Sequence, residues 1–160
     1  MTASNRLVVS DREHSKLIYF LVGPDAARAR SSASKDLDRM KQLTLLLNLH
    51  ARAIGVDLIV GQSDFERELV EWLYEAVEKG ANAVILDAGT FANTSISIRD
   101  AVAAVSVPVI ELHASQLGLG QASAPGTLPP LSAADGRHIL NTYRYVLALH
   151  AAVSATHHQR

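Results

Sequence analysis

Four short stretches of the chain are apolar at nearly every position, with little alternation between apolar and polar residues. They are aliphatic or β-branched almost throughout, which is typical of strands covered on both faces of a parallel sheet. We predict one strand in each of them: KLIYFLVG (16–23), VDLIVG (56–61), NAVILDAG (82–89) and VPVIELHAS (107–115).

Between and after these stretches, apolar residues recur every three or four positions, the spacing of one helix face. Helices are therefore predicted over 35–54, 64–79, 93–105 and 132–154. Gly55 and Gly80 are expected to stop the first two. Asp64 is expected to cap the second helix, and the Asn93–Ser95 stretch the third. The stripe of the last helix is Ile139, Leu140, Tyr143, Val146, Leu147 and His150.

Strand and helix alternate four times along the chain. This order predicts right-handed crossovers and a doubly wound parallel sheet of four to five strands in a single α/β domain. The domain covers 16–154, with a loose N-terminal extension (1–15) and a C-terminal tail (155–160). We interpret GRHILNT (136–142) as helix rather than as a fifth strand.

The composition argues against several classes of function. The net charge is −1 over 160 residues and no basic stripe stands out, which argues against nucleic-acid binding. There is no cysteine, so disulfides and thiolate metal sites are excluded. No apolar run approaches the roughly 20 residues that span a bilayer, and charges interrupt the N-terminus too early for a signal peptide. We expect a soluble cytoplasmic protein.

Polar residues follow the predicted strands, and the carboxyl ends of parallel strands share one edge, where ligands bind in open α/β sheets. Asp25, Asp87 and His113 are the main candidates. Two irregular loops, 24–35 and 115–132, leave from the same edge and are of a kind that is often functional. The pattern predicts a small-molecule site, although Asp25 also suits a plain turn and His113 a satisfied core histidine.

Three ordered segments are similar to a known family. QSDFERELVEWLYEA, ILDAGTFANTSISIRDA and PVIELHAS resemble, in order and spacing, the type II 3-dehydroquinate dehydratases of the shikimate pathway. The resemblance covers about 16–116, with a weaker echo in YRYVLALH (143–150). It implies a flavodoxin-like subunit and a homo-oligomer built from trimers, up to a dodecamer.

The resemblance also implies a reaction. In the family, 3-dehydroquinate loses water through an enolate: a lid tyrosine, helped by a lid arginine, takes the proton, an asparagine-held water stabilises the enolate, and a histidine acts as acid. His113 matches that histidine, and Ala114 with Ser115 match the cradle of the substrate carboxylate. Other matched positions, taken as substrate-binding, are Thr94, Ser95, Arg99, Asp100 and Glu111.

Several catalytic positions depart from the family. Asp25 and Asp87 stand where the family has asparagines, and Asn93 stands where it has a histidine. A carboxylate about 4 Å from the substrate carboxylate would cost about 4 kcal/mol at an effective dielectric of 20, roughly a thousandfold in affinity. Together with the changes in the lid, these substitutions argue against ordinary dehydroquinate turnover.

The lid departs as well. The 24–35 loop holds Arg28 and Arg30 as lid cations but no tyrosine, and no arginine lies between Arg99 and Arg137 to grip the substrate. Loss of the general base removes a step that is typically worth about 10²–10⁴ in rate.

Three interpretations stay open. The favoured one is a pseudoenzyme that keeps the fold and binds a metabolite or nothing. The second is a divergent lyase or hydrolase that acts on another small polar molecule, with His113 as acid and Asp25 or Asp87 as base. The third places a hard divalent cation on the same three residues, a weak signal. A neighbouring subunit that supplies a missing group would restore the family reaction. We predict no metal and no other cofactor.

Overall fold

One five-stranded sheet, in the order β1-β3-β2-β4-β5, forms the centre of the computed structural model. The structure describes residues 5–9, 15–24, 33–112 and 135–156, and side chains within 15–24, 38–112 and 143–156. Strands β2 to β5 are parallel, and β1 runs antiparallel along β3. The strands are β1 (Asn5–Val9), β2 (Lys16–Val22), β3 (Val56–Gln62), β4 (Ala83–Asp87) and β5 (Val109–Glu111).

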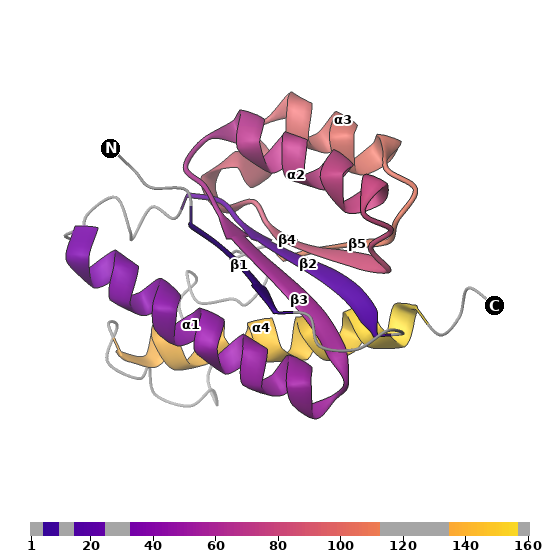
Figure 1. Ribbon diagram of the computed structural model, residues 1–160. Coiled ribbons are helices and arrows are strands. Elements are labelled where there is room, and N and C mark those ends of the chain that lie inside the picture. Colours follow the sequence, from indigo (N-terminus) through magenta and orange to yellow (C-terminus); the bar gives the residue numbers. More distant parts are fainter. Residues whose placement is uncertain (1–4, 10–14, 25–32, 113–134, 157–160) are drawn as a thin grey trace, which may run out of the picture.

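Helices cover both faces of the sheet. Figure 1 shows α1 and α4 on one face and α2 and α3 on the other. Gly55 and Gly80 follow α1 and α2 with φ angles of 71° and 68°, so the two predicted helix stops are confirmed. The helices are α1 (Ala33–Ala53), α2 (Glu66–Glu78), the 3₁₀ helix η2 (Gly89–Asn93), α3 (Ile96–Ala104) and α4 (Asp135–Ala155).

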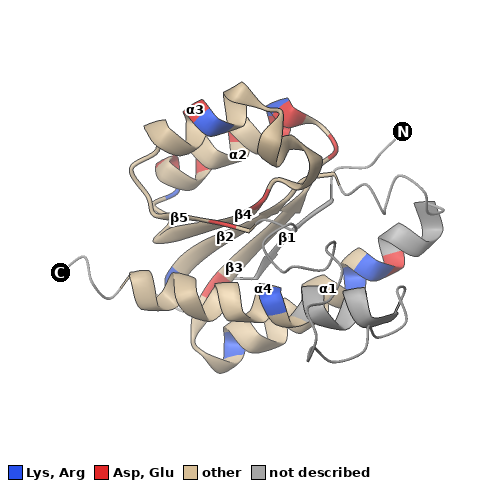
Figure 2. Cartoon of the chain, turned by 180° about the vertical axis from the view of Figure 1, so that it is seen from behind, with Lys and Arg blue, Asp and Glu red and all other residues tan. Residues whose placement is uncertain are grey.

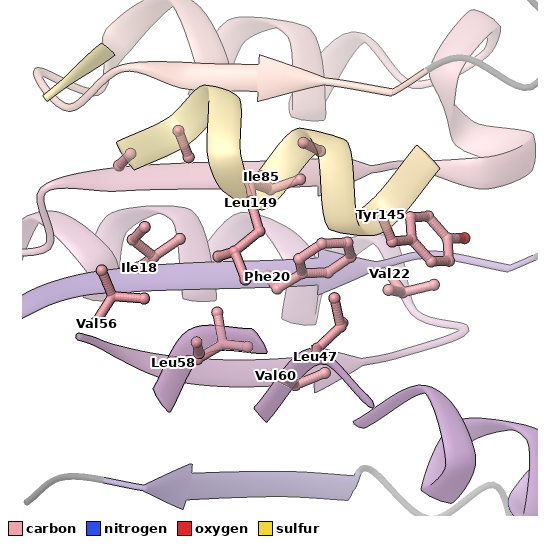
Figure 3. Close-up of a cluster of buried hydrophobic side chains, with 14 residues drawn as sticks. Ile18, Phe20, Val22, Leu47, Val56, Leu58, Val60, Ile85, Tyr145 and Leu149 are labelled. Carbon is pink, nitrogen blue, oxygen red and sulfur yellow. The ribbon is translucent and has the colours of Figure 1, made fainter. Parts of the chain in front are cut away.

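The core consists of two apolar layers, because successive side chains of a strand point to opposite faces of the sheet. In β2, Phe20 and Val22 pack toward α1 and α4, whereas Tyr19 and Leu21 pack toward α2 and α3. Burial of one such side chain contributes about 1.5–3 kcal/mol. Figure 3 shows the α1/α4 layer, with Tyr145 at its end beside Val22, the last residue of β2.

The predicted architecture is confirmed: a single α/β domain with a flavodoxin-like, four-stranded parallel sheet. The segment 136–142 belongs to α4, as interpreted from the sequence. The expectation of a loose extension over 1–15 is wrong for Asn5–Val9, which form β1. This strand covers the outer edge of β3, whose backbone groups would otherwise lie unpaired at the sheet margin.

The predicted caps have different outcomes. Ser95 is the N-cap of α3, and its hydroxyl accepts the backbone N–H of Ile98 at 2.9 Å, so this prediction is confirmed. The prediction for Asp64 is wrong, because the N-cap of α2 is Phe65. The Ser63 hydroxyl accepts the Phe65 N–H at 2.9 Å and so satisfies one of the free donors that precede the helix.

The stripe predicted for the last helix is also wrong in phase. The buried face of α4 is formed by Tyr145, Ala148, Leu149 and Ala152. Tyr143 and Leu147, both expected in the core, are 65% and 68% exposed. Two large and two small side chains thus form the buried face, while Tyr143 and Leu147 face outward.

Basic residues of the described chain do not gather on one side (Figure 2). In Figure 2, Lys and Arg occur on both helical layers of the described chain. None of the described helices combines the length and apolar character that a membrane crossing requires.

Candidate functional site

The C-terminal ends of β2 and β4 flank the point where the direction of sheet growth reverses. The chain passes from β2 to β3 on one side of the sheet, and then to β4 and β5 on the other. In such sheets the crevice at this switch point is the usual ligand site. Val22 and Asp87, the last residues of β2 and β4, are register partners, so Asp87 lies at the switch point.

Backbone hydrogen bonds hold the two strand ends together. The Gly23 N–H donates to the Asp87 carbonyl at 2.7 Å, and the Thr90 N–H donates to the Pro24 carbonyl at 2.8 Å. Gly89 has a φ of 59°, and a Cβ added there would lie 2.0 Å from the Pro24 carbonyl oxygen. Only glycine fits this close approach, so the backbone around Asp87 is tightly positioned.

The Asp87 side chain is buried, with 7% of the residue exposed, and both of its oxygens accept hydrogen bonds from its own chain. Its Oδ2 accepts a hydrogen bond from Arg144 Nη2 at 2.6 Å and from the Tyr145 hydroxyl at 2.7 Å. Its Oδ1 accepts the Gly89 N–H at 3.2 Å. A carboxylate buried without partners would be costly, and this network supplies both a counter-charge and donors.

Tyr145 serves as a hydrogen-bond donor in this network. Burial raises the pKa of its phenol well above the ordinary value of about 10, and the neighbouring Asp87 carboxylate raises it further. Its ring packs edge-on against Phe20, with centroids 5.2 Å apart. At neutral pH Tyr145 is therefore a protonated phenol that is locked in place.

Arg144 has more hydrogen-bond donors than the described residues around it accept. Its side chain is 11% exposed and pairs with Asp87 through Nη2. Its Nε and Nη1 are buried, and neither has a hydrogen-bond acceptor in the part of the chain that the structure describes. The guanidinium carbon lies 5.3 Å from the centroid of the Tyr145 ring. We call Asp87, Arg144 and Tyr145 the switch-point network.

Comparison with known proteins identifies the family. Residues 18–120 match the model described as dehydroquinase class II. The chain belongs to this family. The 3-dehydroquinate dehydratase of Maricaulis maris is 33% identical over 116 residues, which are 72% of this chain and 79% of that protein. The 3-dehydroquinate dehydratase of Mycobacteroides abscessus is 38% identical over 102 residues, 62% of this chain and 70% of that protein.

A solved structure agrees with this assignment. A 3-dehydroquinate dehydratase-like protein from Bifidobacterium longum aligns with a TM-score of 0.57 and 25% identity, over 86% of this chain and 94% of that one.

Two of the residues matched to the type II dehydroquinase motifs lie at the start of α3. Ser95 is buried, and its hydroxyl donates to the carboxylate of Glu66 while it caps α3. Thr94 is exposed and donates to the Thr90 carbonyl at 3.1 Å. Asn93, which ends η2, is exposed as well.

The other described candidates lie on α3 and at the end of β5. Arg99 and Asp100 are exposed on α3, whose buried residues face the layer opposite to Arg144 and Tyr145. Glu111 is exposed at the end of β5 and is the register partner of Leu86, one residue before Asp87. The structure thus brings Asp87 together with α4, while Arg99 and Asp100 lie on the layer that covers the other face of the sheet.

The remaining candidates lie outside the described residues: Asp25, Arg28, Arg30, His113, Ala114 and Ser115. The cluster of Asp25, Asp87 and His113 therefore stays a prediction. The described chain does reach this neighbourhood, since the Leu112 N–H donates to the Leu86 carbonyl at 2.8 Å, one residue before Asp87.

The switch-point network is unsuited to a cation. Both oxygens of Asp87 already accept hydrogen bonds, and an arginine occupies the place of a counter-ion. Across the described ranges, no group of three or more His, Cys, Asp or Glu residues is arranged to hold a metal ion.

Arg144 and Tyr145 were missed by sequence reasoning. The signal that pointed to them was the weak family echo in YRYVLALH, which contains both. The wrong phase assigned to the last helix placed Tyr143 in the core and left Arg144 and Tyr145 unassigned.

Proposed function

We propose that this type II dehydroquinase family member binds a small polar metabolite at the carboxyl edge of its sheet without normal 3-dehydroquinate dehydratase turnover. The observation that carries the proposal is the switch-point network, in which Arg144 and Tyr145 hold the Asp87 carboxylate. The M. maris and M. abscessus relatives are named 3-dehydroquinate dehydratases, so the reaction against which this chain is judged is the dehydration of 3-dehydroquinate.

The first argument concerns a lost amide. The resemblance places at position 87 the asparagine that opens the family's second motif, and this chain has Asp87 there. An ionised carboxylate offers only acceptors, and those of Asp87 already take up donors from Gly89, Arg144 and Tyr145. Asp87 therefore cannot donate a hydrogen bond to a ligand as an asparagine at this position would.

The sequence led us to expect that the Asp87 carboxylate would repel an anionic substrate, and the structure weakens this expectation. The guanidinium 2.6 Å away compensates the carboxylate, so the expected repulsion of an anionic substrate does not apply to it in full. The proposal is supported by the three hydrogen bonds that engage both oxygens of Asp87, rather than by its charge.

The second argument concerns the missing base. The sequence holds four tyrosines, and none lies in 24–35. Tyr145 contacts Asp87 as a protonated donor, and the Tyr19 hydroxyl donates to Glu75 at 3.1 Å from a fully buried ring. Tyr74 and Tyr143 are exposed on helices. None of the four is placed as an activated phenolate beside the network.

The hydrogen bonds of Asp87 also limit the alternative function, a divergent lyase or hydrolase. A divergent lyase or hydrolase with His113 as acid would need Asp25 rather than Asp87 as its base, because three hydrogen bonds engage Asp87. Asp25→Asn separates the two readings: it abolishes the activity of such an enzyme and leaves metabolite binding by a pseudoenzyme in place.

The test is direct. Purified protein is incubated with 3-dehydroquinate and the conjugated enone product is followed at 234 nm, with the M. maris enzyme as positive control. We expect no product above the protein-free rate. Turnover at a rate comparable to the M. maris enzyme would overturn the proposal.

We further propose a cytoplasmic homo-oligomer built from trimers, as the resemblance implies. Size-exclusion chromatography with light scattering checks the assembly. A monomer at micromolar concentration would contradict it.

A further inference from the structure

The Arg144 guanidinium carries more N–H donors than the described residues around it accept. A guanidinium presents five N–H groups. Asp87 accepts from Nη2, while Nε and Nη1 are buried without an acceptor in the described chain. Buried donors are almost always paired in folded proteins, and an unpaired one on a charged group is especially unfavourable. A bound molecule can therefore supply the acceptor that the described residues do not provide.

The position of Arg144 argues for a ligand. It faces Asp87 at the switch point, where molecules bind in open α/β sheets. The guanidinium is also preorganised, since Asp87 holds Nη2 and the Tyr145 ring lies against it. A group that is already fixed loses little freedom when it binds.

We propose that Arg144 forms a subsite for an oxyanion group of the ligand, a carboxylate or a phosphate. Arginine binds these groups through charge-assisted hydrogen bonds, which are about twice as strong as neutral ones. Asp87 occupies one edge of the guanidinium and Tyr145 fixes Asp87, so both are positioning residues for the subsite. The inference rests on the proposed function in one respect, namely that a small molecule binds at this edge.

The test measures stabilisation by two probes, inorganic phosphate and succinate, which separate the two sources of oxyanion. Each is titrated at constant ionic strength with sodium chloride while the Tm is followed. A probe at 100 times its Kd raises the Tm of a chain of this size by about 5–10 °C. We expect such a saturable rise with at least one probe in the wild-type protein.

Three variants localise the effect. Arg144→Lys keeps the charge and removes the guanidinium donors, so we expect at least tenfold weaker binding. Asp87→Asn/Arg144→Gln leaves no lone buried charge, and we expect it to fold and to show no saturable rise. The control is Arg67→Gln: Arg67 is exposed on α2 and pairs with Glu71, and we expect unchanged binding.

The outcomes are distinguishable. Saturable binding that is at least tenfold weaker in Arg144→Lys and absent in the double variant supports the subsite. Absence of a saturable rise with either probe, or binding that persists in the folded double variant, overturns it and leaves Arg144 as a structural partner of Asp87. Enone formation from 3-dehydroquinate by the wild-type protein would refute the proposed function instead. The effect of the Arg144 variants on probe binding would still test the subsite on its own.

Discussion

Replacement of Arg144 by glutamine removes the counter-charge of a buried carboxylate. The two side chains are 11% and 10% exposed and their charged atoms are 2.6 Å apart, so little solvent screens the pair. Removal of one partner from a buried pair typically costs about 3–5 kcal/mol, because the other charge stays buried. Tyr145 and Gly89 still donate to Asp87, which places the expected loss near the lower end of that range. For a chain of this size, that corresponds to a Tm lower by about 6–12 °C.

A double-mutant cycle isolates the pair. The free energy of unfolding is measured by urea titration for Arg144→Gln, Asp87→Asn and the double variant, with Trp72 fluorescence and far-UV circular dichroism as probes. The double variant removes both charges, so its loss should be at least about 1.5 kcal/mol smaller than the sum of the single losses. Arg67→Gln, which breaks an exposed pair, should leave the urea midpoint unchanged.

Two results would refute this reasoning. One is an Arg144→Gln variant with the urea midpoint of Arg67→Gln. The other is a cycle in which the single losses simply add, since independent effects mean that Asp87 and Arg144 do not interact in solution.

Three further predictions concern single positions. Gly89→Ala should destabilise the protein by more than about 2 kcal/mol, because strain at positive φ adds to a backbone clash. Gly80 has a similar φ but open space around it, so Gly80→Ala should cost only about 1 kcal/mol. The free energies of unfolding of the two variants are compared by urea titration. The raised pKa of Tyr145 stabilises the folded state fully below about pH 10, and that stability is lost as the pH rises further. Wild-type unfolding free energy should thus fall more steeply above pH 10 than that of Tyr145→Phe, and parallel curves would contradict the assignment. Ser95→Ala should cost about 1–2 kcal/mol through loss of the α3 cap, against a smaller effect of Thr94→Ala at the exposed neighbour; equal thermal shifts would contradict this.

Much of the sheet was predictable because its strands are buried on both faces. Residues 18–22 and 83–87 are buried at every position, and this produces the continuous apolar runs from which the strands were inferred. β1 was missed because its five residues cover only the edge of β3, so its pattern is short and bordered by polar residues. A strand of this kind carries little local signal.

The site was only partly predictable. Asp87 was found because a carboxylate directly after an apolar strand is conspicuous. Its partners lie 57 and 58 positions further along the chain, and no local pattern reports a contact over that separation. The phase of α4 was misread because Leu147 suggests a buried face more strongly than Ala148 or Ala152, although packing selects the small residues.

The central claim is that the switch-point network has displaced the chemistry of the family. The most direct measurement is exchange of the carbon-bound protons next to the ketone of 3-dehydroquinate, followed by proton NMR in D₂O with and without the protein. Exchange reports removal of a proton to the enolate even when no water is lost. The account predicts the same exchange rate in both samples. Protein-catalysed exchange of one of these protons would show that a working base remains, and would contradict the account.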